Sequence, residues 1–132
     1  MSSLLIFLAL VSAALASALH VFIFYLESLA WTTSRARAVF GISEQAALDT
    51  REMAFNQGFY NLFLAIVTAI GIASWLVGST GIGAALIYAG AGSMLAAAAV
   101  LWLSSPDKRG AAVKQGMFPF LAVVLMTAAL LS

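Results

Sequence analysis

Two ionisable side chains, His20 and Glu27, lie in a long apolar run near the start of the chain. Tyr25 is the one other ionisable side chain before Arg35. An imidazole or a carboxyl group is costly in hydrocarbon, so a membrane segment that carries one pairs it or uses it. We expect His20 and Glu27 to be catalytic candidates, acting as an acid and a base that flank a substrate.

A second polar group, the amides Asn56, Gln57 and Asn61, follows on the second expected helix. Depth in the membrane can be compared at about 1.5 Å per residue from the helix ends. Glu27 then lies roughly 10 Å deep and His20 roughly 21 Å deep, while the three amides lie between roughly 6 and 13 Å. Glu27 is therefore level with the amides, and only His20 reaches the middle. This pattern predicts a pocket that is open to one membrane face, with ligand-binding residues Tyr25, Asn56, Gln57, Tyr60, Asn61 and Gln115.

Structural interpretations of the same residues stay open. Glu27 is either a protonated acid that donates to Asn56 or Asn61, or a carboxylate paired with Arg35 or Arg51. His20 fits a neutral imidazole bonded across helices, and the amides fit contacts between helices. The three tryptophans fall near the ends of the expected helices, where an aromatic belt at the membrane surface explains Trp31, Trp75 and Trp102.

A metal site is not expected. His20 and Glu27 are about 10.5 Å apart along a helix axis, whereas ligands of one ion converge at about 2 Å. The chain has no cysteine, which excludes thiolate ligands and cysteine nucleophiles. We therefore predict neither a metal nor another cofactor.

Composition places these residues in a membrane. The 132 residues are 64% hydrophobic and 8% charged, whereas a soluble domain has roughly 25% charged residues. A net charge of +1 without a basic run argues against nucleic acid as a partner. The sequence predicts an all-α, single-domain membrane bundle over residues 1–132, with four transmembrane helices at about 4–33, 53–77, 82–103 and 112–131.

The first connection, residues 34–52, is not expected to be a plain loop. Ser43 can cap a helix, and Glu44 suits its first turn. Either the second helix begins near Ser43, or residues 43–52 form a separate interfacial helix.

All six Lys and Arg residues fall in or beside residues 34–52 and 104–114. With four spans, these two connections share one side of the membrane, and the excess of cations makes that side cytoplasmic. We therefore expect a multi-pass protein of the cell membrane (in bacteria the inner membrane) with both termini outside.

The third expected helix carries a stripe of small residues. Gly83, Gly90 and Ala97 recur at a spacing of seven, with further alanines and glycines nearby. Such a stripe lets helix backbones approach closely in lipid.

The polar motifs also resemble those of a known family. His20-x4-Tyr25-x-Glu27, then Asn56-Gln57-Gly58-x-Tyr60-Asn61, then Gln115-Gly116-x2-Pro119 are similar to the domain-of-unknown-function family numbered thirteen-hundred-and-four. Its members are small four-helix membrane proteins of bacteria and fungi, with no activity to carry over. The resemblance implies that the His/Glu and Asn/Gln positions form the family signature.

Three functions follow as hypotheses. In the first, a polar pocket facing the cytoplasmic side or inner leaflet binds or converts a small apolar or amphipathic molecule. In the second, the chain is a proton-coupled exporter that acts as a dimer. In the third, it is a structural or accessory subunit. The expected partners are the lipid bilayer, a small lipophilic ligand and, in the exporter hypothesis, a second copy. Whether the protein is an enzyme stays open.

Overall fold

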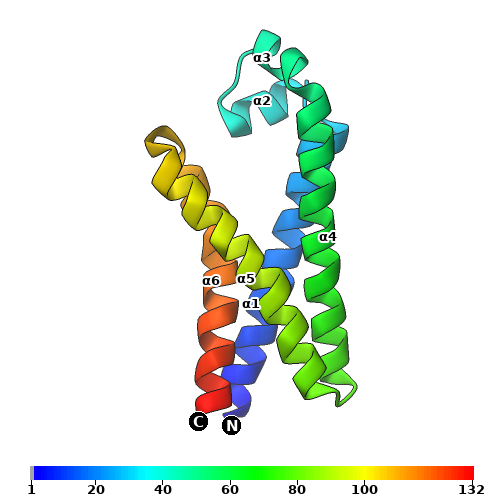
Figure 1. Ribbon diagram of the computed structural model, residues 1–132, viewed down its shortest axis with the longest axis vertical. Coiled ribbons are helices and arrows are strands. Elements are labelled where there is room, and N and C mark those ends of the chain that lie inside the picture. The colour runs from blue at the N-terminus through cyan, green and yellow to red at the C-terminus, as the bar shows by residue number, and fades with distance from the viewer. Residues whose placement is uncertain (1) are drawn as a thin grey trace.

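The computed structural model describes residues 2–132 and consists of helices joined by short connections (Figure 1). Its long helices are α1 (Ser3–Phe24), α4 (Arg51–Leu76), α5 (Thr80–Ser104) and α6 (Arg109–Leu131). The short elements are the π-helical turn η1 (Tyr25–Leu29), α2 (Ser34–Phe40), α3 (Glu44–Asp49) and the 3-10 turn η2 (Pro106–Lys108). Residues 2–132 contain no strand, which confirms the predicted all-α class.

Four segments are long and apolar enough to cross a membrane, and they begin and end at Ser3–Leu29, Arg51–Leu76, Thr80–Ser104 and Pro106–Leu131. At 1.5 Å per residue each reaches more than the roughly 30 Å of a hydrocarbon core. The four-helix bundle predicted from the sequence therefore fits a small membrane domain.

The first helix ends earlier than expected, at Leu29 rather than Thr33. The chain turns at Ala30, and the Thr33 hydroxyl then accepts a hydrogen bond from Ala36 N at 3.3 Å. This cap starts α2, a helix that was not predicted from the sequence. The left-handed φ of +65° at Gly41 ends it, because glycine adopts that conformation without steric cost.

Within the expected segment 43–52, Glu44–Asp49 form the separate short helix α3, and Arg51 and Glu52 already belong to α4. The Ser43 hydroxyl accepts a hydrogen bond from Ala46 N at 3.1 Å and caps α3. Thr50, with φ −105° and ψ 7°, breaks the chain between α3 and α4. The first connection therefore contains two short helices, α2 and α3.

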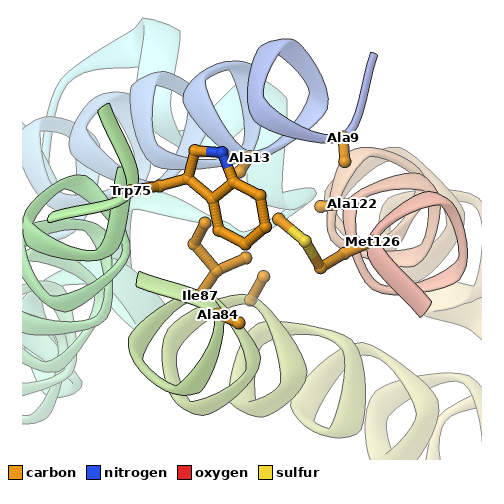
Figure 2. Close-up of a cluster of buried hydrophobic side chains, with 8 residues drawn as sticks. Ala9, Ala13, Trp75, Ala84, Ile87, Ala122 and Met126 are labelled. Atoms are coloured by element: carbon orange, nitrogen blue, oxygen red, sulfur yellow. The ribbon is translucent and has the colours of Figure 1, made fainter. Parts of the chain in front are cut away.

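The long helices form a ring of neighbours. α1 packs against α4 and α6, and α5 packs against the same two helices, whereas α1 and α5 on one diagonal have few contacts. All four helices contribute to a buried cluster around the Trp75 indole (Figure 2). Its members are Ala9, Ala13, Trp75, Ala84, Ile87, Ala91, Ala122 and Met126. Trp75, which is 8% exposed, therefore belongs to the core and not to an aromatic belt.

Close contact between α4 and α5 depends on glycine. A Cβ added to Gly83 would lie 2.7 Å from Trp75 N, and one added to Gly71 would lie 2.8 Å from Ile87 N. At Gly90 it would overlap the Thr68 hydroxyl. The predicted small-residue stripe is therefore right for Gly83 and Gly90, but it stops there, because Ala97 is exposed.

The two ends of the bundle differ in what they carry. Both chain termini and the α4–α5 connection lie at one end, which we call the terminal end, and α2, α3 and the α5–α6 connection lie at the other (Figure 1). We call the second end the charged end, because all six Lys and Arg residues belong to it or to the first two turns of the helices that start there. At the charged end, α5 and α6 are separated from α1 and α4 (Figure 1).

Candidate functional site

The candidate site is built on η1, where the first membrane-spanning segment widens into a π-helical turn. Ala30 N donates to the Tyr25 carbonyl five residues earlier, at 3.0 Å. Single π-helical turns are rare and occur frequently at functional sites. Here the wider turn carries Glu27 and Ser28 toward α4.

Gly58 on α4 makes that approach sterically feasible. A Cβ on Gly58 would overlap the Ser28 hydroxyl and would lie 3.0 Å from Ser28 N and 3.1 Å from the Glu27 Cβ. The Ser28 hydroxyl uses the space to donate to the Phe55 carbonyl at 2.7 Å. The turn is therefore anchored on α4 beside Glu27.

Glu27 is half-buried and contacts one of the predicted amides. Asn61 Nδ2 donates to Glu27 Oε2 at 2.8 Å, and it also lies 3.2 Å from the Gln57 carbonyl. Asn61 is one of the two amide partners predicted for Glu27, but the amide donates and the Glu27 oxygen accepts, which is the reverse of the predicted direction. Arg35 instead lies over the Phe22 ring, 5.7 Å from its centre.

A cavity of about 520 Å³ opens beside Glu27 at the charged end. It lies between η1, the turn that follows it, the end of α3 and the start of α4. Its walls mix charged, hydroxyl and apolar side chains, from Glu27, Ser28, Leu29, Trp31, Thr32, Leu48, Asp49, Arg51, Glu52 and Phe55. Such a lining suits a ligand with both an apolar and a polar part.

Trp31 joins the parts of the chain that form this cavity. Its indole N–H donates to the Thr50 hydroxyl at 3.1 Å, and its ring lies 4.9 Å from the Phe40 ring. Thr50 in turn donates to the Ala46 carbonyl at 2.6 Å. Trp31 therefore holds α2 and the α3–α4 junction against the turn, which is a packing role beyond the membrane belt expected from its position.

His20 does not share the cavity with Glu27. It is 2% exposed, and its Nδ1 donates to the Ala16 carbonyl of its own helix at 2.8 Å. The expected bond across helices is therefore wrong. A backbone carbonyl one turn earlier is a local alternative to a partner on another helix, and here it satisfies the Nδ1–H group of the imidazole. The two catalytic candidates do not flank a common space.

The remaining predicted ligand-binding residues do not gather at the cavity. Asn56 donates to the Glu52 carbonyl of its own helix at 3.1 Å. Tyr25 and Tyr60 are 44% and 65% exposed. Two further residues lie elsewhere: Gln57 is exposed on α4, and Gln115 is partly buried on α6.

Most cavity residues were not predicted as site residues. Asp49 and Glu52 lie in residues 34–52, the predicted first connection, and Thr32 lies at the end of the predicted first helix, so none of the three was considered for a site. No periodicity marks them, because the cavity arises from the fold-back of α2 and α3 over η1. Gly58 carried a signal, since it stands within the Asn56-Gln57-Gly58 motif.

The site offers hydrogen-bonding and charged side chains. In residues 2–132 no group of three or more His, Asp or Glu side chains is placed to hold a metal ion. Glu27 provides a carboxyl group that accepts a hydrogen bond from one amide, and the charged side chains Asp49, Arg51 and Glu52 line the same cavity. Hydrogen bonding and charge attraction are what this arrangement can supply.

The family described as protein of unknown function (DUF1304) matches residues 14–127. The chain belongs to this family. The match covers η1, Glu27, Gly58 and Asn61, so the DUF1304 region contains the whole Glu27 cavity. No curated protein and no solved structure matches the chain.

Proposed function

We propose that this DUF1304 protein lies in the cell membrane with its charged end in the cytoplasm, and that it binds a small amphipathic molecule in the Glu27 cavity. All six Lys and Arg residues lie in or beside the connections at the charged end, which supports this orientation. Both termini then lie outside, and the ligand enters from the cytoplasmic side or the inner leaflet.

The proposal depends on one observation. The carboxyl group of Glu27 belongs to a candidate membrane span, and it lines a cavity whose walls are both polar and apolar. A volume of about 520 Å³ falls in the roughly 300–1,000 Å³ range of small-molecule sites. Leu29, Leu48 and Phe55 offer apolar walls for the body of the ligand.

The charges of the lining favour one kind of head group. The cavity holds the carboxyl groups of Glu27, Asp49 and Glu52 against the guanidinium of Arg51. A head group that is cationic or rich in hydrogen-bond donors complements this excess of acceptors. His20 has no part in the proposal because it lies outside the cavity, so the function is binding rather than acid–base conversion by a His20–Glu27 pair.

The test uses three probes with the same apolar chain: diazirine derivatives of decylamine, decanol and decanoate. The full chain in lipid nanodiscs is photolabelled with each probe, and the labelled peptides are mapped by mass spectrometry. We expect the amine to label the cavity residues at the lowest concentration. Glu27→Gln should weaken amine labelling about tenfold, which corresponds to about 1.4 kcal/mol, and should leave the decanol labelling unchanged.

Glu44→Gln is the matched control, because it removes the same charge from an exposed residue of α3 outside the cavity. It should label like the unmodified protein. Equal labelling by the three probes, or an equal loss in both variants, would contradict a specific site at Glu27.

A further inference from the structure

The outer surface of α5 and α6 carries an apolar groove near the charged end, separate from the Glu27 cavity. Its volume is about 330 Å³. Ala98, Ala112 and Gly116 form its floor and are buried where the two helices meet. Trp102 and Phe120 form part of its walls and are 42% and 51% exposed, so the groove opens to the outside of the bundle, where lipid chains lie around a membrane protein.

Close packing of small residues gives the groove its depth. A Cβ on Gly116 would lie 2.8 Å from the Ala98 Cβ, so α5 and α6 touch at this point. The larger side chains stand on either side of the contact. The result is a furrow along two helices, a shape that fits an extended hydrocarbon chain.

Arg109 lies against Trp102 at the end of the groove nearest the charged end, which we call the mouth of the groove. Its guanidinium lies 4.2 Å from the centre of the Trp102 ring, and its Nε donates to the Trp102 carbonyl at 3.0 Å. Arg109 also precedes Ala112, Val113 and Gly116 at spacings of three, four and seven, so it continues their face of α6. The two contacts use one edge and one face of the guanidinium, and its terminal N–H groups can bind a phosphate in bidentate fashion.

The net positive charge of the charged end belongs to this side of the bundle. Residues 104–114 carry three cations and one carboxylate, that of Asp107, whereas residues 34–52 carry three of each sign. A second copy docked in a symmetric dimer would bring one Arg109 mouth against the other, with repulsion between like charges. Apolar walls with a cationic mouth instead complement an anionic lipid.

We propose that the α5–α6 groove binds an anionic phospholipid, with one acyl chain along Ala98 and Gly116 and the phosphate at Arg109. Basic residues beside grooves between helices at the cytoplasmic membrane face are known to attract such head groups. The site is independent of the Glu27 cavity, with which it shares no lining residue.

Native mass spectrometry of the detergent-solubilised full chain tests the proposal. Dioleoyl phosphatidylglycerol and dioleoyl phosphatidylcholine are titrated separately, and we expect adducts of the anionic lipid at lower concentration. Arg109→Gln should weaken phosphatidylglycerol binding about fivefold, the effect of one cation near a membrane surface. Ala99→Phe, which fills the groove and keeps Arg109, should weaken it as well.

Lys114→Gln is the matched control, because this substitution removes the same charge from α6 at a residue that, unlike Arg109, makes no hydrogen bond or ring contact with the groove wall Trp102. It should bind phosphatidylglycerol like the unmodified protein. An equal loss in Lys114→Gln would overturn the proposal in favour of diffuse charge attraction. Displacement of the lipid by millimolar inorganic phosphate, or an unchanged affinity in Ala99→Phe, would overturn the acyl-chain contact.

Two further readouts keep these outcomes distinct. Far-UV circular dichroism establishes whether each variant is folded. If Arg109→Gln is not folded, the phosphatidylglycerol affinity of Ala99→Phe alone decides the test. A shift of the protein mass from dimer to monomer in Ala99→Phe, with unchanged lipid affinity, would assign the groove to a second copy and overturn the lipid site.

Discussion

At the terminal end of the bundle the backbones of α4 and α5 are in contact. At the charged end the helices instead surround the Glu27 cavity and the α5–α6 groove. Glycine is essential in both places. At Gly83 the Trp75 backbone occupies the space that a side chain would need, because a Cβ added to Gly83 would lie 2.7 Å from Trp75 N. At Gly58 the corresponding space is filled by Ser28, a polar residue of η1.

The difference separates stability from binding. An apolar cluster surrounds Trp75, and the buried Thr68, two turns earlier on α4, donates to the Leu64 carbonyl of its own helix at 2.9 Å. Around Gly58 two polar side chains bond across helices: Asn61 donates to Glu27, and Ser28 donates to the Phe55 carbonyl. Groups that bond across helices next to a cavity can exchange their partner for a ligand, and the terminal end provides the rigid support.

The largest effect is expected from a large side chain at the terminal end. Gly83→Leu places Cβ against the Trp75 backbone, which cannot move without separating α4 from α5. We expect a loss of about 3 kcal/mol or more in the free energy of unfolding. Reversible unfolding in mixed SDS micelles, followed by far-UV circular dichroism, measures it.

Gly92→Leu is the matched control, since no atom lies within 4 Å of a Cβ added there and the residue belongs to the same helix. Its free energy of unfolding should change by less than about 1 kcal/mol. Similar losses in the two variants would show that leucine destabilises α5 anywhere, and the contrast between the two ends would fail.

The terminal end was also the easier half to predict from sequence. Long apolar stretches and a stripe of small residues are local signals of membrane helices and of close packing. For this reason the sequence correctly predicted that Gly83 and Gly90 allow close packing between helices. The level of Glu27 with Asn61 was predictable for the same reason, because depth depends only on the rise per residue.

The charged end depends on contacts that local patterns do not contain. The π-helical turn forms where Gly58 admits Ser28, and the cavity forms where α2 and α3 fold back. A helical wheel also cannot tell a bond across helices from one to a carbonyl in the same helix, which is the bond that His20 and Asn56 make. Tyr60 is exposed on the half of α4 that begins at Arg51, and α5 turns away from α4 at that end of the bundle (Figure 1).

A smaller effect is expected at the charged end, from Gly58→Ala. The new methyl group displaces the Ser28 hydroxyl from the Phe55 carbonyl, which costs about 1–2 kcal/mol in the free energy of unfolding. Because Glu27 follows the turn, binding of the decylamine probe should weaken in the same variant. SDS unfolding and photolabelling measure the two effects.

A double-mutant cycle with Ser28→Ala sharpens this prediction. Without the hydroxyl, the methyl group of Gly58→Ala has more room, so the two losses should not add, and their coupling should be about 1 kcal/mol. Gly92→Ala, at an open position of α5, should instead stabilise the helix by up to about 1 kcal/mol. Additive losses in the cycle would mean that Ser28 does not contact Gly58.

The smallest effect is expected from Tyr88→Phe on α5. Tyr88 Oη lies 2.8 Å from the Thr127 hydroxyl of α6, and both residues are near the terminal end. Thr127 also donates to the Val123 carbonyl at 2.8 Å, so it keeps a partner when the phenol is removed. A hydrogen bond between membrane helices contributes about 0.6 kcal/mol on average, and SDS unfolding should show a loss of that size.

Ser93→Ala is the control, because Ser93 donates only to the Ala89 carbonyl of its own helix. A loss in Tyr88→Phe close to that of Gly83→Leu would mean that hydrogen bonds, rather than close backbone packing, hold the terminal end together.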